Sequence, residues 1–150
     1  MKLHFLVVGK TVNKHLNALI LDYTDRIGHY LPFEMEVLPE VKNSKSLNVD
    51  QQKQKEADML KKAFRDGDWV ILLDEGGREF RSVDFSVFLE RKQVSVPRRL
   101  VFVVGGPYGF APEIYALAKE KISLSKMTFS HQMVRLIFVE QVYRAMTILR

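Results

Sequence analysis

The stretch Arg99-Leu-Val-Phe-Val-Val104, followed at once by Gly105-Gly-Pro-Tyr-Gly109, decides the fold class. An apolar run of this length, rich in β-branched residues and ended by glycine, predicts a strand buried on both faces. Further strands are predicted at Leu3–Val8, Phe33–Leu38, Asp68–Leu73 and Lys121–Leu124. The second of these alternates apolar residues with glutamate, as a strand with one solvated face does.

Apolar residues at helical spacing fill the intervals between these strands. The predicted helices span Asn13–Arg26, Asp50–Phe64, Asp84–Arg91, Pro112–Lys119 and Gln132–Leu149. Ser82 is expected to cap the third helix, and the polar residues 40–48 to form a surface loop. Apolar strands that alternate with helices predict an α/β fold. We expect a mostly parallel sheet with helices on both faces, in one domain over residues 1–150.

The composition limits the class of protein and its compartment. The chain has 150 residues, 47% of them hydrophobic, and no cysteine. A disulfide framework, a thiolate nucleophile and a cysteine zinc site are therefore excluded, and no metal is predicted. The apolar run at the N-terminus is too short for a signal peptide, and charged residues interrupt the apolar stretch 133–149. We expect a cytoplasmic protein with no membrane span.

The positive charge of the chain lies mainly at its C-terminal end. The net charge is +5, and residues 121–150 carry five basic side chains and one acidic one. Over residues 1–66 the numbers are 11 and 9, and over 67–120 they are 7 and 8. A local excess of Lys and Arg favours a polyanion partner, although a merely soluble basic surface explains it as well.

Three loops are candidates for a ligand site, because ligands on parallel sheets bind after the carboxyl ends of strands. They follow Leu73, Val104 and Leu124. The loop Gly105–Gly109 lets a ligand approach its backbone closely, because its glycines have no Cβ. The spacing matches neither a P-loop nor a dinucleotide fingerprint. A tight turn between a strand and a helix accounts for the same glycines without any ligand.

The other two loops carry polar groups of ambiguous meaning. The segment Asp74–Gly77 is predicted to end its strand, and Asp74 can contact a ribose or a positive centre, or simply cap the turn. The loop Leu124–His131 mixes hydroxyl groups, Lys126 and large apolar side chains, which suits a flat heterocycle held against apolar walls. His131 is either a cap or packing residue or a functional group.

The last predicted helix is apolar on nearly every side. A helix of this kind must be covered on every side, and a second subunit is the simplest cover. A central helix in a monomeric core is the alternative. Glu140 and Arg144 stand four residues apart in the order that favours an ion pair.

Four blocks of the sequence resemble one family closely. They are Leu72-Leu-Asp-Glu-Gly-Gly77, Val104-Gly-Gly-Pro-Tyr-Gly109, Leu124-Ser-Lys-Met-Thr-Phe-Ser-His-Gln132 and Val139-Glu-Gln-Val-Tyr-Arg-Ala145. The chain resembles the ribosomal large-subunit pseudouridine methyltransferase H family, the YbeA-like proteins, of the SPOUT class. The opening strand that ends in Val8-Gly-Lys10 is similar too, so the resemblance covers essentially the whole chain.

The resemblance implies a SPOUT-type α/β knot, with a trefoil knot near the C-terminus, and a homodimer built on the knotted region. It implies S-adenosylmethionine as the cofactor, bound largely through backbone groups. By motif position, the cofactor contacts fall at Leu73, Gly105, Leu124, Ser125, Lys126, Met127, Thr128 and Phe129. The implied reaction is methylation at N3 of a pseudouridine in 23S ribosomal RNA, with the ribosome as partner. Arg144 and Lys126 are candidates for positioning phosphate or base.

Two rival functions stay open at this point. One is a ribosome-binding module without catalysis, and the other is a SPOUT methyltransferase with another RNA target. In the family the last helix continues into a short tail with Tyr and His, whereas this sequence stops at Arg150, inside that motif. Either a tail follows beyond Arg150 or the protein has none. No group is therefore assigned to accept the N3 proton.

Overall fold

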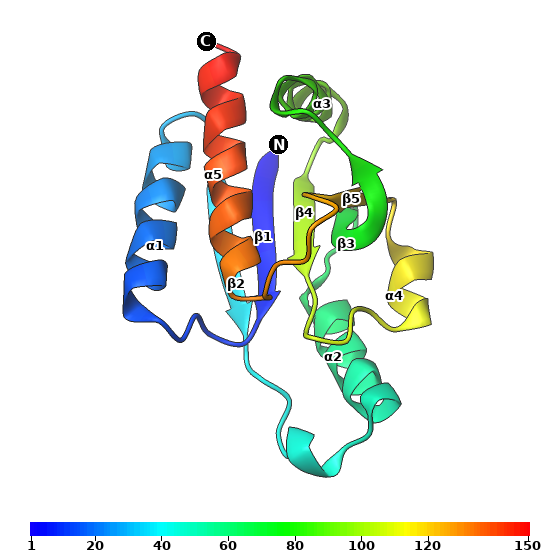
Figure 1. Ribbon diagram of the computed structural model, residues 1–150. Helices are drawn as coiled ribbons and strands as arrows, with labels where there is room; N and C mark the ends of the chain where they lie inside the picture. The colour runs from blue at the N-terminus through cyan, green and yellow to red at the C-terminus, as the bar shows by residue number, and fades with distance from the viewer.

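A five-stranded parallel sheet with the order β2-β1-β4-β3-β5 forms the centre of the computed structural model, which describes residues 1–150 (Figure 1). The strands are β1 (Lys2–Val8), β2 (Phe33–Leu38), β3 (Trp69–Glu79), β4 (Arg99–Val104) and β5 (Glu120–Ser123). The helices are α1 (Lys14–Gly28), α2 (Val49–Ala63), α3 (Ser82–Ser95), α4 (Pro112–Leu117) and α5 (Met133–Ile148), with a short 3₁₀ turn η1 (Ser44–Ser46). The predicted α/β fold with a parallel sheet is confirmed.

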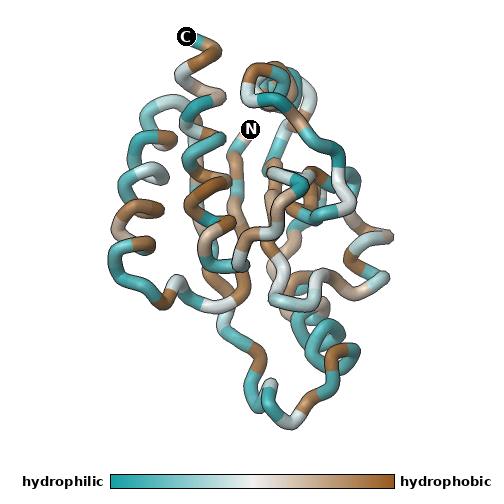
Figure 2. Tube along the Cα trace, viewed as in Figure 1, coloured by the Kyte–Doolittle hydropathy of each residue, from teal (hydrophilic) through white to brown (hydrophobic).

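Helices cover both faces of the sheet, as expected. The inward residues of α1, α3 and α5 share one hydrophobic core with every second residue of the central strands, among them Phe5 and Phe102. The opposite face, with Leu6 and Val103, packs against α2 and α4. Figure 2 shows hydrophobic segments along the central strands and in the middle of α5, whereas α2 and the loop before it are largely hydrophilic. Each central strand is therefore covered on both faces, which explains its continuous apolar sequence.

The strand β3 departs from the prediction that Asp74–Gly77 would end it. The strand continues to Glu79, and both Leu73 and Arg78 pair with Ile122 of β5. The residues between them bulge out of the ladder, so one partner position serves two residues of β3. A Cβ at Gly77 would lie 2.5 Å from the backbone nitrogen of Ile122, so only glycine allows this approach.

Two further local predictions were wrong. Ser82 is the first residue of α3 and not its cap, which is Arg81; its hydroxyl donates to Oε1 of Gln141 on α5 over 2.7 Å. The strand β2 has the predicted bounds but not a clean solvated face. It lies at the sheet edge, where Val37 is 45% exposed, while Glu36 accepts from the buried His4 over 2.6 Å.

The helix α5 lies between α1 and α3 on one face of the sheet (Figure 1). Its residues Phe138, Val139 and Val142 are fully buried within the single chain, whereas Met133 and Ile148 are more than one-third exposed. One chain therefore covers most of this helix but leaves apolar side chains open at both ends. No helix of the chain has the length and hydropathy that a bilayer span requires.

Candidate active site

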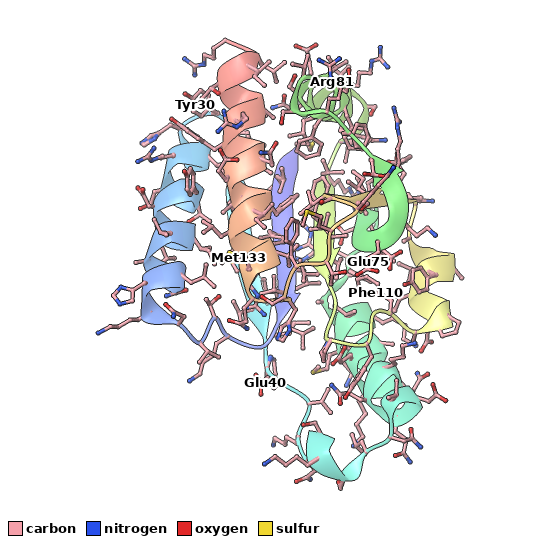
Figure 3. The ribbon with its side chains drawn as sticks, in the orientation of Figure 1. Tyr30, Glu40, Glu75, Arg81, Phe110 and Met133 are labelled. Carbon is pink, nitrogen blue, oxygen red and sulfur yellow. The ribbon has the colours of Figure 1, made fainter.

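The three candidate loops meet at the carboxyl edge of the sheet and enclose one cavity of about 430 Å³. Of the eight residues predicted to contact the cofactor, seven line this cavity: Leu73, Gly105, Leu124, Ser125, Met127, Thr128 and Phe129. Figure 3 shows Glu75 of β3 and Phe110 of the loop after β4 near one another, and both line the cavity, whereas Met133 at the start of α5 lies to one side. Because β3, β4 and β5 are parallel neighbours, their carboxyl ends bring together segments far apart in sequence.

Two predicted site residues lie outside the cavity wall. Lys126 is exposed and is absent from the lining, although Ser125 and Met127 on either side of it are part of the lining. Arg144 lies on α5, with its side chain 54% exposed, and forms the expected ion pair with Glu140. Neither side chain reaches the cavity of its own chain.

Packing within the protein itself favours glycine at two positions of the loop after β4. A Cβ at Gly105 would lie 3.0 Å from the ring of Phe110, and one at Gly106 would lie 2.5 Å from Oε2 of Glu56. Of the three glycines of this loop only Gly109 has a positive φ, +79°, so turn geometry explains that glycine and packing explains the other two. The same loop also lines the cavity, and the cavity, not the glycines, indicates a ligand site.

Glu56 supports the glycine loop from α2, a role that the sequence analysis missed. It is only 7% exposed, and Gln52 donates to its Oε2 over 3.2 Å. Burial raises the pKa of Glu56, and the contacts with Gln52 and the backbone of Gly106 oppose that rise. A glutamate beside Ala57 on the inward stripe of α2 is the signal that could have revealed it.

Asp74 is held at the cavity wall by two donors. The hydroxyl of Tyr115 donates to its Oδ1 over 2.6 Å, and the amide of Gly76 donates to its Oδ2 over 3.0 Å. The turn-capping interpretation of Asp74 is thus correct, while the carboxylate also faces the cavity. Burial, together with the hydrogen bond to Asp74, raises the pKa of Tyr115 to about 12.

The loop after β5 takes its shape from its own hydrogen bonds. The hydroxyl of Ser123 donates to the carbonyl oxygen of Ser125 over 2.8 Å, and the Ser125 hydroxyl accepts from the amide of Met127 over 2.9 Å. The hydroxyl of Thr128 donates to Oε1 of Glu75 over 3.2 Å, which connects this loop to the end of β3. Short hydroxyl side chains thereby fix the turn and leave apolar groups to line the cavity.

A buried arginine, also missed from the sequence, joins α5 to the end of β1. Arg135 is fully buried and donates to the carbonyl oxygens of Gly9 over 2.7 Å, Val8 over 2.9 Å and His131 over 3.1 Å. Burial lowers its pKa, and Glu40 opposes the change. His131 lines the cavity, so this arginine fixes the backbone at one wall.

A parallel α/β sheet with one cavity among three carboxyl-end loops defines the class, and the comparison of sequences agrees. The family model described as "Predicted SPOUT methyltransferase" matches residues 1–150, so the chain belongs to the SPOUT methyltransferase family. The resemblance noted from the sequence is confirmed.

Similar proteins of known name match along nearly the whole chain. A protein of Phocaeicola vulgatus named Ribosomal RNA large subunit methyltransferase H is 62% identical over 149 residues, which cover 99% of this chain and 95% of that protein. Proteins of Parabacteroides distasonis and Bacteroides fragilis with the same name are 58% identical over the same lengths.

Proposed function

We propose that this enzyme transfers the methyl group of S-adenosylmethionine to N3 of a pseudouridine in large-subunit ribosomal RNA. The observation that carries the proposal is the single cavity to which the three loops contribute. Family membership supports a methyltransferase, and the names of the similar proteins support the ribosomal RNA target.

The cavity fits an adenosine in size and in the chemistry of its walls. Its volume of about 430 Å³ lies within the range of small-molecule sites. We assign adenine to the apolar walls at Leu73 and Phe129, with the backbone at Gly105 and at 124–128 reading its edge and the ribose. Lys126 contributes through its main chain only, because its side chain is exposed and outside the lining.

The chemistry asks little of side chains. When bound, the sulfonium supplies an already electrophilic methyl group. The protein then has to exclude water, align the nitrogen of the base with that methyl group and let the N3 proton leave. We assign Arg144 to the phosphate or base of the RNA, because it is exposed on α5 beside Glu140. An RNA loop presents its bases at lower cost than a duplex.

We further propose that two copies pair through α5 in a homodimer. The apolar side chains Met127 and Met133 are 75% and 44% exposed, next to the cavity and at the start of α5. A second copy would cover them. Light scattering at micromolar concentration should give twice the chain mass of 17.4 kDa, and a monomer would contradict the proposal. The trefoil knot and the cytoplasmic location are expected on the same family grounds.

The decisive experiment is mass spectrometry of ribosomal RNA from cells without the gene. The methyl-pseudouridine signal should disappear and return with the wild-type gene. An unchanged signal would favour another RNA target. A ribosome-binding module without catalysis is excluded if calorimetry detects S-adenosylmethionine binding and labelled methyl appears in the RNA.

A further inference from the structure

The cavity wall carries negative charge in a protein that is positive overall. Apart from His131, the only acidic or basic residues that line the cavity are Asp74 and Glu75. Neither a lysine nor an arginine lines it. The net charge of the whole chain is +5. A wall of this sign repels phosphate groups and attracts a cation. The charge at the cavity is thus opposite to that expected for the RNA surface.

Asp74 is held in position. Both of its oxygens accept hydrogen bonds, from Tyr115 and from Gly76. The ammonium of Lys121 lies 5.6 Å from the centre of the Tyr115 ring and forms no ion pair with Asp74. A Cβ at Gly76 would lie 3.2 Å from Oδ2 of Asp74 and 3.9 Å from Nζ of Lys121, so this ammonium is nearby without pairing with the carboxylate.

Glu75 is the less constrained carboxylate. Its Oε1 accepts from Thr128 over 3.2 Å, and its second oxygen has no partner within the protein. The side chain is exposed at the cavity, where a ligand can reach it. One oxygen thus holds the loop after β5, and the other is available to a bound cation.

We infer that Asp74 and Glu75 are specificity residues that select the cofactor for its positive sulfonium centre. The inference rests on the proposed function and goes beyond it. The sulfonium form of the cofactor carries one positive charge that the product, S-adenosylhomocysteine, lacks. When the S–CH₃ bond breaks, its electron pair stays on sulfur. The N3 nitrogen forms a bond to the methyl group and loses its proton to water. The attraction to the two carboxylates ends at that moment, so the wall distinguishes cofactor from spent product.

The test measures binding of three ligands by calorimetry to the full-length protein. S-adenosylmethionine has both the sulfonium charge and the amino-acid tail. S-adenosylhomocysteine has the tail without the sulfonium charge, and 5′-methylthioadenosine has neither the tail nor that charge. In Glu75→Gln the Kd of S-adenosylmethionine should rise about tenfold, as one removed charge at close range allows. The Kd values of the other two ligands should stay within about twofold, since neither contains a sulfonium. Asp74→Asn should act in the same direction.

Two matched variants separate charge from shape. Thr128→Val removes the hydrogen bond to Glu75 but keeps its charge, so the preference for S-adenosylmethionine should persist. Glu90→Gln removes an exposed carboxylate of α3 outside the cavity and should change no Kd. Equal weakening of S-adenosylmethionine and S-adenosylhomocysteine in Glu75→Gln would overturn the inference, because the carboxylate would then contact the shared tail. Loss of 5′-methylthioadenosine binding in that variant, or no change in any Kd, would overturn it as well. If the wild-type protein bound none of the three ligands, the proposed function itself would fail.

Discussion

The buried guanidinium of Arg135 donates to the carbonyl oxygen of Gly9 across 2.7 Å, which joins the first turn of α5 to the end of β1. Residues 126 positions apart in sequence thus share one hydrogen bond in the interior. The same guanidinium holds the carbonyl of His131 at the cavity wall. The Arg135 side chain therefore donates hydrogen bonds to the backbone of two loops, the one after β1 and the one before α5.

Arg135→Met should destabilise the protein by about 3 kcal/mol, because it leaves several buried carbonyl oxygens without donors. Arg135→Lys should recover only part of this loss, since one ammonium cannot reproduce the forked geometry. Urea unfolding followed by circular dichroism provides the measurement. Arg91→Met, at an exposed site on α3, is the control and should shift stability by less than about 0.5 kcal/mol. Equal stabilities of the Arg135→Met variant and the wild-type protein would show that the hydrogen bonds contribute nothing net.

Gly106→Ala should weaken both folding and cofactor binding, because its Cβ would meet the Glu56 carboxylate at 2.5 Å. We expect a loss of about 1 kcal/mol in the free energy of unfolding, at the low end for overpacked sites, because the carboxylate is the end of a flexible side chain. The double variant Glu56→Ala/Gly106→Ala should recover part of the loss, because the obstructing carboxylate is gone. A double-mutant cycle measures the coupling, and strictly additive effects would rule out the contact.

Asp68→Asn should destabilise the protein at neutral pH by about 3 kcal/mol, because Asp68 and Arg99 form a buried ion pair at 2.6 Å. Burial raises the pKa of Asp68, but the hydrogen bonds from Arg99 and from the Arg65 amide, together with the charge of Arg99, outweigh it and hold the pKa below its ordinary value. The stabilisation is present above the unfolded pKa of about 3.9 and is lost as pH falls through the folded pKa.

The difference between Asp68→Asn and wild type should therefore shrink on acidification below about pH 4. Urea titrations at a series of pH values measure it. Asp66→Asn, an exposed neighbour whose side chain makes no ion pair, should show no such trend. A difference that is independent of pH would locate the effect in packing and not in charge.

Tyr115→Phe should remove a tyrosine that ionises late. The pKa of Tyr115 is raised to about 12, so its protonated form stabilises the fold fully below the unfolded pKa of about 10 and the contribution is lost as pH rises to 12. Ultraviolet titration of tyrosinate in the folded protein should show the late step in wild type and lack it in the variant. A titration in which the variant retained that step would assign it to another tyrosine.

The layers of the fold and the set of loops that form the site follow from the amino-acid pattern alone. Runs such as 99–104 are apolar at nearly every position, and a strand of this kind must be covered on both faces of its sheet. The parallel arrangement then places the ends of β3, β4 and β5 at one edge, which is why seven predicted residues line one cavity. These conclusions depend on periodicity and chain direction, which are local properties of the sequence.

The partners of the polar residues, in contrast, depend on how the folded chain packs. Glu56, Arg135 and Tyr115 gain their roles from groups 41 to 127 positions away in sequence, and nothing in local spacing specifies such pairs. The same holds for Ser82, which bonds to α5 instead of capping its own helix. A hydrogen bond depends on distances of a few tenths of an ångström, and those distances are set by how the whole sheet and its helices pack.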